Sequence, residues 1–386
     1  MPALFTFYDP AASGDDFFSE RFLHEVEHNV APAVWPTLAA FAVVVAATPL
    51  LILAARRMGF LSHPRARDIH TRPIPYLGGV GMFLGFAVAC LVFLRDAPGV
   101  PGLLVLGGLT TAVLLVDDRV GMPAPVKLGV QVGIAVLAVL VFGFGIHFIF
   151  LPPLHVRDLG LFVLPVTVVW IVGMQNTINL LDGLDGLAAS VVGVTALVLL
   201  IASTNRPDQA HVVALSGALA GVCAGFLLFN FHPARIFMGD SGAHFLGLAV
   251  ALLAVIGVAK IAVAAALLVP VLALALPIAD TALAIVRRRR NGQSIAHADT
   301  RHLHHRLLEL GLTQREICLL FACCTGILGA MGLTVFGHRR ILAVAIVLLI
   351  VVLSTVLGER LRGSRRRIPV PFYRVVRLLL EDRGLR

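Results

Sequence analysis

Two adjacent acidic residues at the end of an apolar run are the first candidates for chemistry in this sequence. Asp117 and Asp118 follow directly after the apolar stretch 110–116. Neighbouring carboxylates repel each other and are costly beside hydrocarbon. A solvated helix end would account for them. A site in which one carboxylate binds a divalent cation and the other accepts a proton would also account for them.

A second group of polar residues recurs at every third position. Asn176, Asn179, Asp182 and Asp185 have this spacing, and a glycine follows each Asp. A 3₁₀-like turn would stack the four side chains on one side, and an α-helix would spread them over one half of its surface. An Asp-capped helix start would explain only one Asp and one Gly. The segment is therefore predicted to bind a ligand.

A third loop is bracketed by Asn230 and Asp240, and glycine lies on both sides of the acidic residue. A plain N-cap of the following helix would account for Asp240. An acidic residue at a helix start also suits Mg²⁺, and the free amides of that helix end suit a phosphate. Gly239 and Gly242 leave room for such a ligand.

Histidine and arginine gather in two further loops. Imidazole and guanidinium groups donate hydrogen bonds to phosphate oxygens, so these loops are predicted to meet a phosphate-rich ligand. Zinc fits less well, because tetrahedral zinc sites usually include Cys or a spaced carboxylate. Excess positive charge on one membrane face would also explain the earlier of the two loops. The residues are His70, Arg72, Arg301, His302, His304 and His305.

Apolar segments of membrane-spanning length provide the frame for these residues. Hydrophobic residues make up 58% of the 386 residues and charged residues only 14%, which excludes an ordinary soluble domain. We predict an all-α polytopic membrane protein with about eleven transmembrane helices. They are expected at 33–55, 77–94, 101–116, 126–142, 160–175, 187–203, 211–228, 242–257, 260–286, 316–336 and 341–357.

Positive charge is distributed unequally between the two sides of these segments. Of the 31 Lys and Arg residues, 24 follow odd-numbered segments and 7 lie on the other side. The positive-inside rule then places the N-terminus outside and the C-terminus in the cytoplasm. The candidate residues all follow odd-numbered segments, so we expect them to meet at the cytoplasmic face of the inner membrane. The same rule explains the net charge of +9 without nucleic-acid binding.

The predicted organisation has three parts. Residues 1–32 form an acidic extracytoplasmic segment, 33–358 form the transmembrane domain, and 359–386 form a basic cytoplasmic tail. Nine Arg residues in that tail are expected to rest on anionic lipid headgroups. The sequence leaves a homodimer open.

Several of these segments, in chain order, resemble the polyprenyl-phosphate N-acetylhexosamine-1-phosphate transferases. The matching stretches are 70–79 (HTRPIPYLGG), the Asp117 and Asp118 pair with Lys127 and Gln131, 176–187, 230–240, and 288–307. The resemblance covers roughly residues 60 to 310. It implies a Mg²⁺-dependent reaction, with Mn²⁺ as an alternative ion. In this reaction, an oxygen of undecaprenyl or a longer polyprenyl phosphate attacks the β-phosphorus of a UDP-N-acetylhexosamine. UMP leaves, and a lipid-linked pyrophosphoryl sugar remains.

The resemblance also implies roles for the candidate residues. Asp240 and Asp182 would bind the cation, and Asp117 and Asp118 would join Asp240 as catalytic residues beside the lipid phosphate. The remaining residues would bind the substrates. They are Asn179, Asp182, Asp185 and Asn230 at the nucleotide, together with Asn176, Lys127, His70, Arg72, Arg301, His302, His304 and His305.

Two alternatives to this assignment stay open. The segment 287–294 and the later His-Leu-His-His resemble the UDP-N-acetylglucosamine users that start cell-envelope polysaccharides, although 295–299 departs from their pattern. The same chemistry on UDP-MurNAc-pentapeptide, in peptidoglycan synthesis, is the nearer alternative. An ion-coupled transporter is the other, and it would place acidic residues near the bilayer midplane rather than at segment ends.

Overall fold

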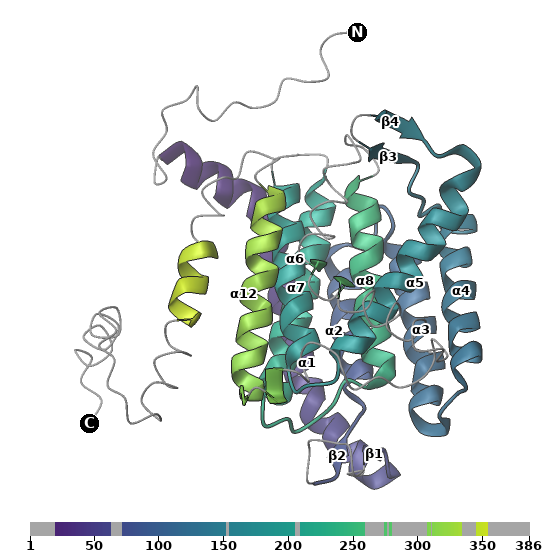
Figure 1. Ribbon diagram of the computed structural model, residues 1–386, viewed down its shortest axis with the longest axis vertical. Coiled ribbons are helices and arrows are strands. Elements are labelled where there is room, and N and C mark those ends of the chain that lie inside the picture. The colour runs from purple at the N-terminus through teal and green to yellow at the C-terminus, as the bar shows by residue number, and fades with distance from the viewer. Residues whose placement is uncertain are drawn as a thin grey trace, which may run out of the picture.

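A bundle of long apolar helices makes up most of the computed structural model (Figure 1). The residues that the structure describes are 20–62, 72–151, 154–204, 209–258, 274–275, 278–279, 307–309, 311–333 and 345–353. The named helices are α1 (Glu20–Met58), α2 (Gly78–Phe93), α3 (Val100–Val120), α4 (Ala124–Leu140), α5 (Val163–Leu181), α6 (Leu187–Ser203), α7 (Ala210–Asn230), α8 (Gly239–Val258) and α12 (Gln314–Leu333).

The helices have the length and composition of membrane spans. Within the described ranges, six are long and apolar enough to cross a bilayer, and α2, α4 and α6 are shorter apolar helices. The chain is therefore an α-helical multi-pass membrane protein. Helices coincide with the first eight predicted segments and with the tenth. The ninth lies almost wholly outside the described residues, and 345–353 is helical within the eleventh.

Several helices begin or end at residues other than those predicted. The segments predicted to end at 116 and 175 continue as helix to Val120 and Leu181. Polar residues were expected to end these spans, but here the helix extends through them into the site described below. At the N-terminus, α1 begins at Glu20, so the predicted boundary at residue 32 falls inside a helix.

Two small hairpins were not predicted. β1 (Leu61–Ser62) pairs with β2 (Ile74–Pro75), and β3 (Phe148–Leu151) pairs with β4 (Leu154–Asp158). They lie at opposite ends of the bundle (Figure 1). Each belongs to a connection between helices, so the all-α architecture of the membrane part is unchanged.

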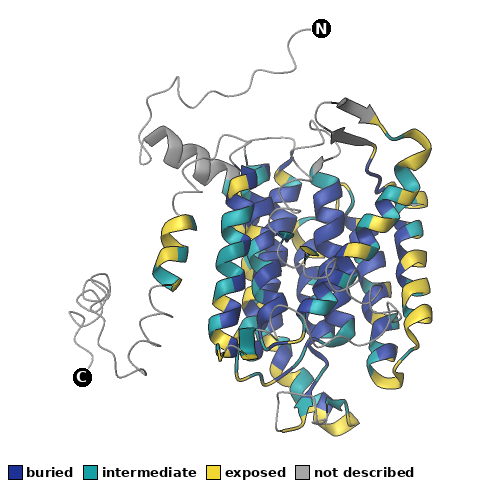
Figure 2. Cartoon of the chain, in the orientation of Figure 1, coloured by how far each residue is buried: buried dark blue, intermediate teal, exposed yellow. Residues whose placement is uncertain are grey.

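The core sits around α6, α7 and α8, which are buried along most of their length (Figure 2). Helix α8 packs against both α3 and α5, and α7 packs against α1 and α6. On the outside, large apolar side chains such as Val169 and Leu140 are exposed. Exposed apolar residues of this kind suit contact with lipid tails.

Glycine spacing explains how closely α7 approaches α1. Gly217, Gly221 and Gly225 recur every four residues and therefore share one face of α7. A Cβ at Gly217 would lie 2.6 Å from Thr37 Oγ1, and one at Gly221 would overlap the Thr37 backbone. Small residues at this spacing let two membrane helices pack backbone to backbone.

Candidate active site

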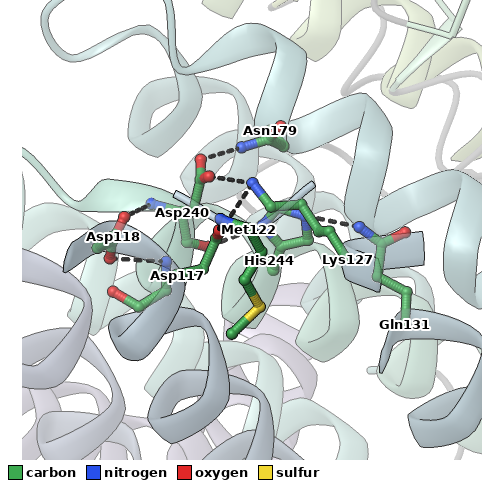
Figure 3. Close-up of polar contacts among 9 residues, drawn as sticks. Asp117, Asp118, Met122, Lys127, Gln131, Asn179, Asp240 and His244 are labelled. Atoms are coloured by element: carbon green, nitrogen blue, oxygen red, sulfur yellow. Dashed lines mark hydrogen bonds and ion pairs between the residues drawn. The ribbon is translucent and has the colours of Figure 1, made fainter. Parts of the chain in front are cut away.

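Acidic side chains from the end of one helix and the start of another meet in the structure (Figure 3). Asp117 and Asp118 lie in the last turn of α3, and Asp240 lies in the first turn of α8. The Asp118 carboxylate accepts hydrogen bonds from the backbone N–H of Asp240 at 2.7 Å and of Ser241 at 3.2 Å. Asp118 therefore caps α8 from a neighbouring helix, where free amides and the helix dipole favour a negative charge.

Gly239 makes this cap possible. Its φ of +71° is in the left-handed region, which favours glycine. A Cβ at this position would lie 2.6 Å from Asp118 Oδ2. Glycine is thus required at position 239 for two reasons, which are the close approach of the Asp118 carboxylate and the positive φ of the backbone turn.

Lys127 joins the acidic residues. Its Nζ, on the first turns of α4, lies 2.6 Å from Asp117 Oδ2 and also forms an ion pair with Asp240 Oδ2. The Asp117 side chain is 3% exposed and that of Asp240 is 35% exposed. Of the two, Asp240 is therefore the carboxylate that a ligand can reach.

Asp117 also closes the turn between α3 and α4. Its Oδ1 accepts the backbone N–H of Met122 at 2.5 Å, and its carbonyl accepts the N–H of Gly121 at 2.7 Å. Gly121 has a φ of +72°, as is common for the residue that ends a helix. Asp117 thus fixes the approach of α4, and with it the position of Lys127.

The polar residues of α5 also reach this centre. Asn179 Nδ2 donates to Asp240 Oδ1 at 2.7 Å. Asn176 Nδ2 donates to Gln131 Oε1 on α4 at 2.6 Å. Both amides lie inside α5 and turn toward α4 and α8, so within the structure each is engaged by a protein partner.

Asp182 follows α5 directly, outside the helix. Burial raises the pKa of its carboxyl well above the usual value, and the charges of Asp240, Asp118 and Asp185 raise it further. Carboxylates crowded in this way disfavour one another's ionised form. A cation bound among them would relieve the repulsion.

Asp185 and Asn230 tie together the two loops beside the acidic centre. Asp185 Oδ2 lies 2.7 Å from His232 Nδ1 and accepts the N–H of Ala234 at 3.1 Å. Asn230 is 1% exposed. It accepts the N–H of Gly186 at 3.0 Å and donates to the Ile236 carbonyl at 2.8 Å. Through these bonds the α5–α6 turn and the α7–α8 loop hold a single arrangement.

The first connecting loop pairs with the segment before Asp240. Phe237 donates its N–H to the Pro75 carbonyl at 2.7 Å, and Gly79 donates to the Met238 carbonyl at 2.9 Å. The backbone of Gly79 lies against that of Gly242, since a Cβ at Gly242 would be 2.9 Å from Gly79 Cα. Two glycine-containing motifs that are far apart in the sequence are therefore adjacent in the structure.

The other predicted site residues are not placed in this centre by the described part of the structure. Arg72 is exposed in the bend before β2. The others lie outside the described residues, and they are His70, Arg301, His302, His304 and His305.

Two buried polar residues in this region were not among the predicted site residues. His244 is completely buried on α8, and its Nε2 lies 2.8 Å from Gln131 Nε2. Gln131 is 1% exposed. Each follows a site residue by four positions, Asp240 and Lys127 respectively, and therefore lies on the same helix face. That spacing was the available signal, but a single polar residue inside an apolar span does not show which way it faces.

The centre thus combines carboxylates, one ammonium group and carboxamides on rigid helix ends. Within the described part of the chain, no three His, Cys, Asp or Glu side chains already form a metal-binding cluster. Lys127 instead contacts two of the carboxylates. Such a centre can neutralise phosphate charge with the ammonium group. A divalent cation at Asp240 would have to replace Lys127 or Asn179, because both oxygens of that carboxylate are engaged.

Two names recur among known proteins of similar sequence. The glycosyl transferase family 4 profile matches residues 100–258. A probable undecaprenyl-phosphate N-acetylglucosaminyl 1-phosphate transferase of Bacillus subtilis is 33% identical over 320 residues, which are 82% of this chain and 88% of that protein. A decaprenyl-phosphate N-acetylglucosaminephosphotransferase of Mycolicibacterium smegmatis is 36% identical over 344 residues, covering 79% and 84% of the two chains.

The second group bears another name. A phospho-N-acetylmuramoyl-pentapeptide-transferase of Moorella thermoacetica is 32% identical over 315 residues, covering 75% of this chain and 96% of that protein. Matches to this group are weaker than those to the N-acetylglucosamine group. The matched regions of both groups are long enough to include the whole acidic centre.

Proposed function

We propose that this chain, which belongs to glycosyl transferase family 4, transfers N-acetylglucosamine 1-phosphate from UDP-N-acetylglucosamine to a polyprenyl phosphate. An oxygen of the lipid phosphate attacks the β-phosphorus, the bond between the α- and β-phosphates breaks, and UMP leaves. The product is a polyprenyl-diphosphate sugar. The names of the more strongly matching relatives support this donor and this class of acceptor.

The observation that carries the proposal is the meeting of Asp118, Lys127, Asn179 and Asp240 from four different helices at one end of the bundle. Exchange of one pyrophosphate bond for another requires little covalent chemistry from a protein. It requires the two phosphates to be aligned and their charge to be neutralised. A rigid set of charged groups at a helix N-terminus meets both requirements.

The contacts favour positioning roles for the acidic pair of α3. The carboxylate of Asp118 is bonded to the backbone of α8, and that of Asp117 to Met122 and Lys127. The second pKa of a phosphate monoester is about 6, so the attacking oxygen is largely unprotonated at neutral pH. The reaction therefore places little demand on a general base. In this scheme the pair fixes Lys127 and Asp240, and the Lys127 ammonium neutralises a phosphate oxygen.

Mg²⁺, or Mn²⁺ in its place, is part of the proposal. A bound divalent cation would neutralise the diphosphate and the leaving UMP. The residues present fit such an ion, because Asp240 is partly exposed and Asp182 is destabilised in its charged form by burial and by three neighbouring carboxylates. Asp240 and Asp182 would hold it. On this basis activity is lost in EDTA and returns with added MgCl₂.

We place the site at the cytoplasmic face of the inner membrane. The excess of Lys and Arg beside the same loops supports this orientation. A site at the ends of α3, α5 and α8 is within reach both of a water-soluble nucleotide sugar and of a phosphate whose isoprenoid tail stays in the bilayer. This geometry favours a transferase over a transporter, whose ionisable residues would lie deeper.

The test uses the purified full chain in detergent with undecaprenyl phosphate and MgCl₂. UDP-N-acetylglucosamine and UDP-MurNAc-pentapeptide, each labelled in the sugar, are supplied separately. We expect label in the lipid extract with the first donor, and none when the lipid phosphate is omitted. Label transferred only from the second donor would replace this proposal with the peptidoglycan reaction, and no transfer from either would reject both.

A further inference from the structure

A chain of three side chains lies one helical turn below the acidic centre. Gln131, Asn176 and His244 come from α4, α5 and α8. Each has a partner in the acidic centre on its own helix. Gln131 lies four residues after Lys127, Asn176 three residues before Asn179, and His244 four residues after Asp240. Four residues of α-helix correspond to about 6 Å. The second set therefore repeats the first at a greater depth, on the same three helices.

The hydrogen bonds of this chain run in one direction. His244 Nδ1 lies 2.8 Å from the Asp240 carbonyl, which can only accept, so Nδ1 carries the hydrogen. In a neutral ring Nε2 is then an acceptor, and Gln131 Nε2, 2.8 Å away, donates to it. Gln131 Oε1 in turn accepts from Asn176 Nδ2 at 2.6 Å. Every donor in the chain faces an acceptor.

Burial makes these bonds costly to break. His244 is fully buried and Gln131 is 1% exposed. A buried polar group that loses its partner retains its full cost of desolvation. The chain therefore has one low-energy arrangement, in which the imidazole connects the Gln131 amide to the backbone of α8.

The Asp240 carbonyl belongs to the residue whose carboxylate lies at the centre of the proposed site. The N–H of Asp240 is held by Asp118 and its carbonyl by His244, so both backbone groups of this residue are fixed by side chains. The carboxylate itself contacts Lys127 and Asn179. The three helices that meet at the carboxylate are thus linked a second time, one turn away from it.

We infer that His244 is a positioning residue that, through Gln131 and Asn176, sets the distances between Asp240, Lys127 and Asn179. The inference rests on the proposed function, because the geometry that it sets is that of the phosphate site. His244 touches no substrate in this scheme. It acts through the backbone of Asp240, so its loss changes the rate of the chemical step more than the binding of either substrate.

Three substitutions separate the two bonds of the imidazole. His244→Asn keeps a donor near the place of Nδ1, His244→Gln keeps an acceptor near the place of Nε2, and His244→Leu keeps neither. Supporting side chains around reactive groups typically contribute about 10- to 100-fold to activity. We expect His244→Leu to lower kcat by that factor and to change KM for both substrates by less than about threefold. Because the ring acts as a link, the Asn and Gln variants fall nearly as far.

A double variant distinguishes positioning from simple stability. His244→Leu leaves the Gln131 amide buried without an acceptor, so Tm falls. Adding Gln131→Leu removes that unsatisfied group, and Asn176 Nδ2 keeps its bond to the Val172 carbonyl, so we expect Tm to recover while kcat stays low. Recovery of kcat together with Tm would overturn the inference, since the side chains would then serve only the fold.

The matched control is Thr195→Val. Thr195 is fully buried on α6 and donates to the Val191 carbonyl of its own helix, away from the chain of three, and we expect wild-type kcat. An active wild type whose His244→Leu variant is equally active would overturn this inference alone. A wild type without transfer activity would overturn the proposed function, and this inference with it.

Discussion

Asp240 is the residue at which the contacts of the site converge. It receives an ion pair from Lys127, a hydrogen bond from Asn179 and a backbone cap from Asp118. We predict that Asp240→Asn lowers kcat by about 10²- to 10³-fold, because the divalent cation that would neutralise the reacting phosphates loses a charged oxygen ligand. The measurement is label transfer to lipid, with Tm in detergent recorded for the same sample.

The control for that variant is Asp96→Asn. Asp96 pairs with Arg95 in an exposed loop and its side chain is 89% exposed, so both kcat and Tm should match the wild type. An Asp240→Asn enzyme with near-normal turnover would remove Asp240 from the proposed cation site.

Lys127 has a second role at the residue scale, in stability. Lys127→Gln leaves the buried Asp117 carboxylate without its cation, and we expect a loss of about 3 kcal/mol in the free energy of unfolding. The double variant Asp117→Asn with Lys127→Gln removes the uncompensated charge. It should regain most of the lost Tm but no activity. A double variant as unstable as the single one would mean that the ion pair is not what stabilises this turn.

At the scale of elements, the packing of α7 on α1 gives the clearest prediction. Alanine at Gly221 would place a Cβ on the Thr37 backbone, and overpacking of this kind costs about 1–3 kcal/mol. Alanine is otherwise favoured over glycine in a helix by about 1 kcal/mol. We therefore expect Gly221→Ala to lower Tm despite its better helix propensity.

Gly129→Ala is the matched comparison on α4. A Cβ at Gly129 meets nothing within 4 Å, so helix propensity alone should act and Tm should stay unchanged or rise. Equal shifts in both variants would indicate that α1 and α7 do not pack as the structure shows.

The elements also show what the sequence could predict. Long apolar segments identified the nine named helices of the described residues, because membrane spans carry a strong hydropathy signal. Helix ends were less accurate where Asn176 and Asn179 extend α5, because polar residues that face other helices resemble the end of a span. The hairpin strands of two to five residues carry no usable pattern.

For the site, too, the sequence predicted some features and not others. The spacing of carboxylates and amides predicted where chemistry would gather, since all these residues follow odd-numbered segments. It did not predict which polar atoms are engaged inside the protein. Asn230 was expected to line the nucleotide site, yet its amide bonds to Gly186 and Ile236. His244 was missed because it lies within an apolar helix, and only the packing shows that it faces Gln131.

At the scale of the whole molecule, the two ends of the bundle should lie on opposite sides of the membrane. Arg235 is exposed in the loop beside the site, and Leu161 is 96% exposed in the 3₁₀ turn η1 (Gly160–Phe162) that follows β4. In intact cells, an impermeant maleimide should label Leu161→Cys, and it should label Arg235→Cys only after permeabilisation. Background from the native cysteines is measured on the parent chain. Labelling of both positions in intact cells would contradict the assigned sides.

The whole account depends on which bond of the nucleotide sugar breaks. The direct measurement uses UDP-N-acetylglucosamine labelled with ³²P at the β-phosphate, together with undecaprenyl phosphate, MgCl₂ and the purified chain. Transfer of a sugar phosphate predicts that ³²P enters the lipid extract in step with release of unlabelled UMP. Release of labelled UDP, with the sugar alone on the lipid, would contradict the account.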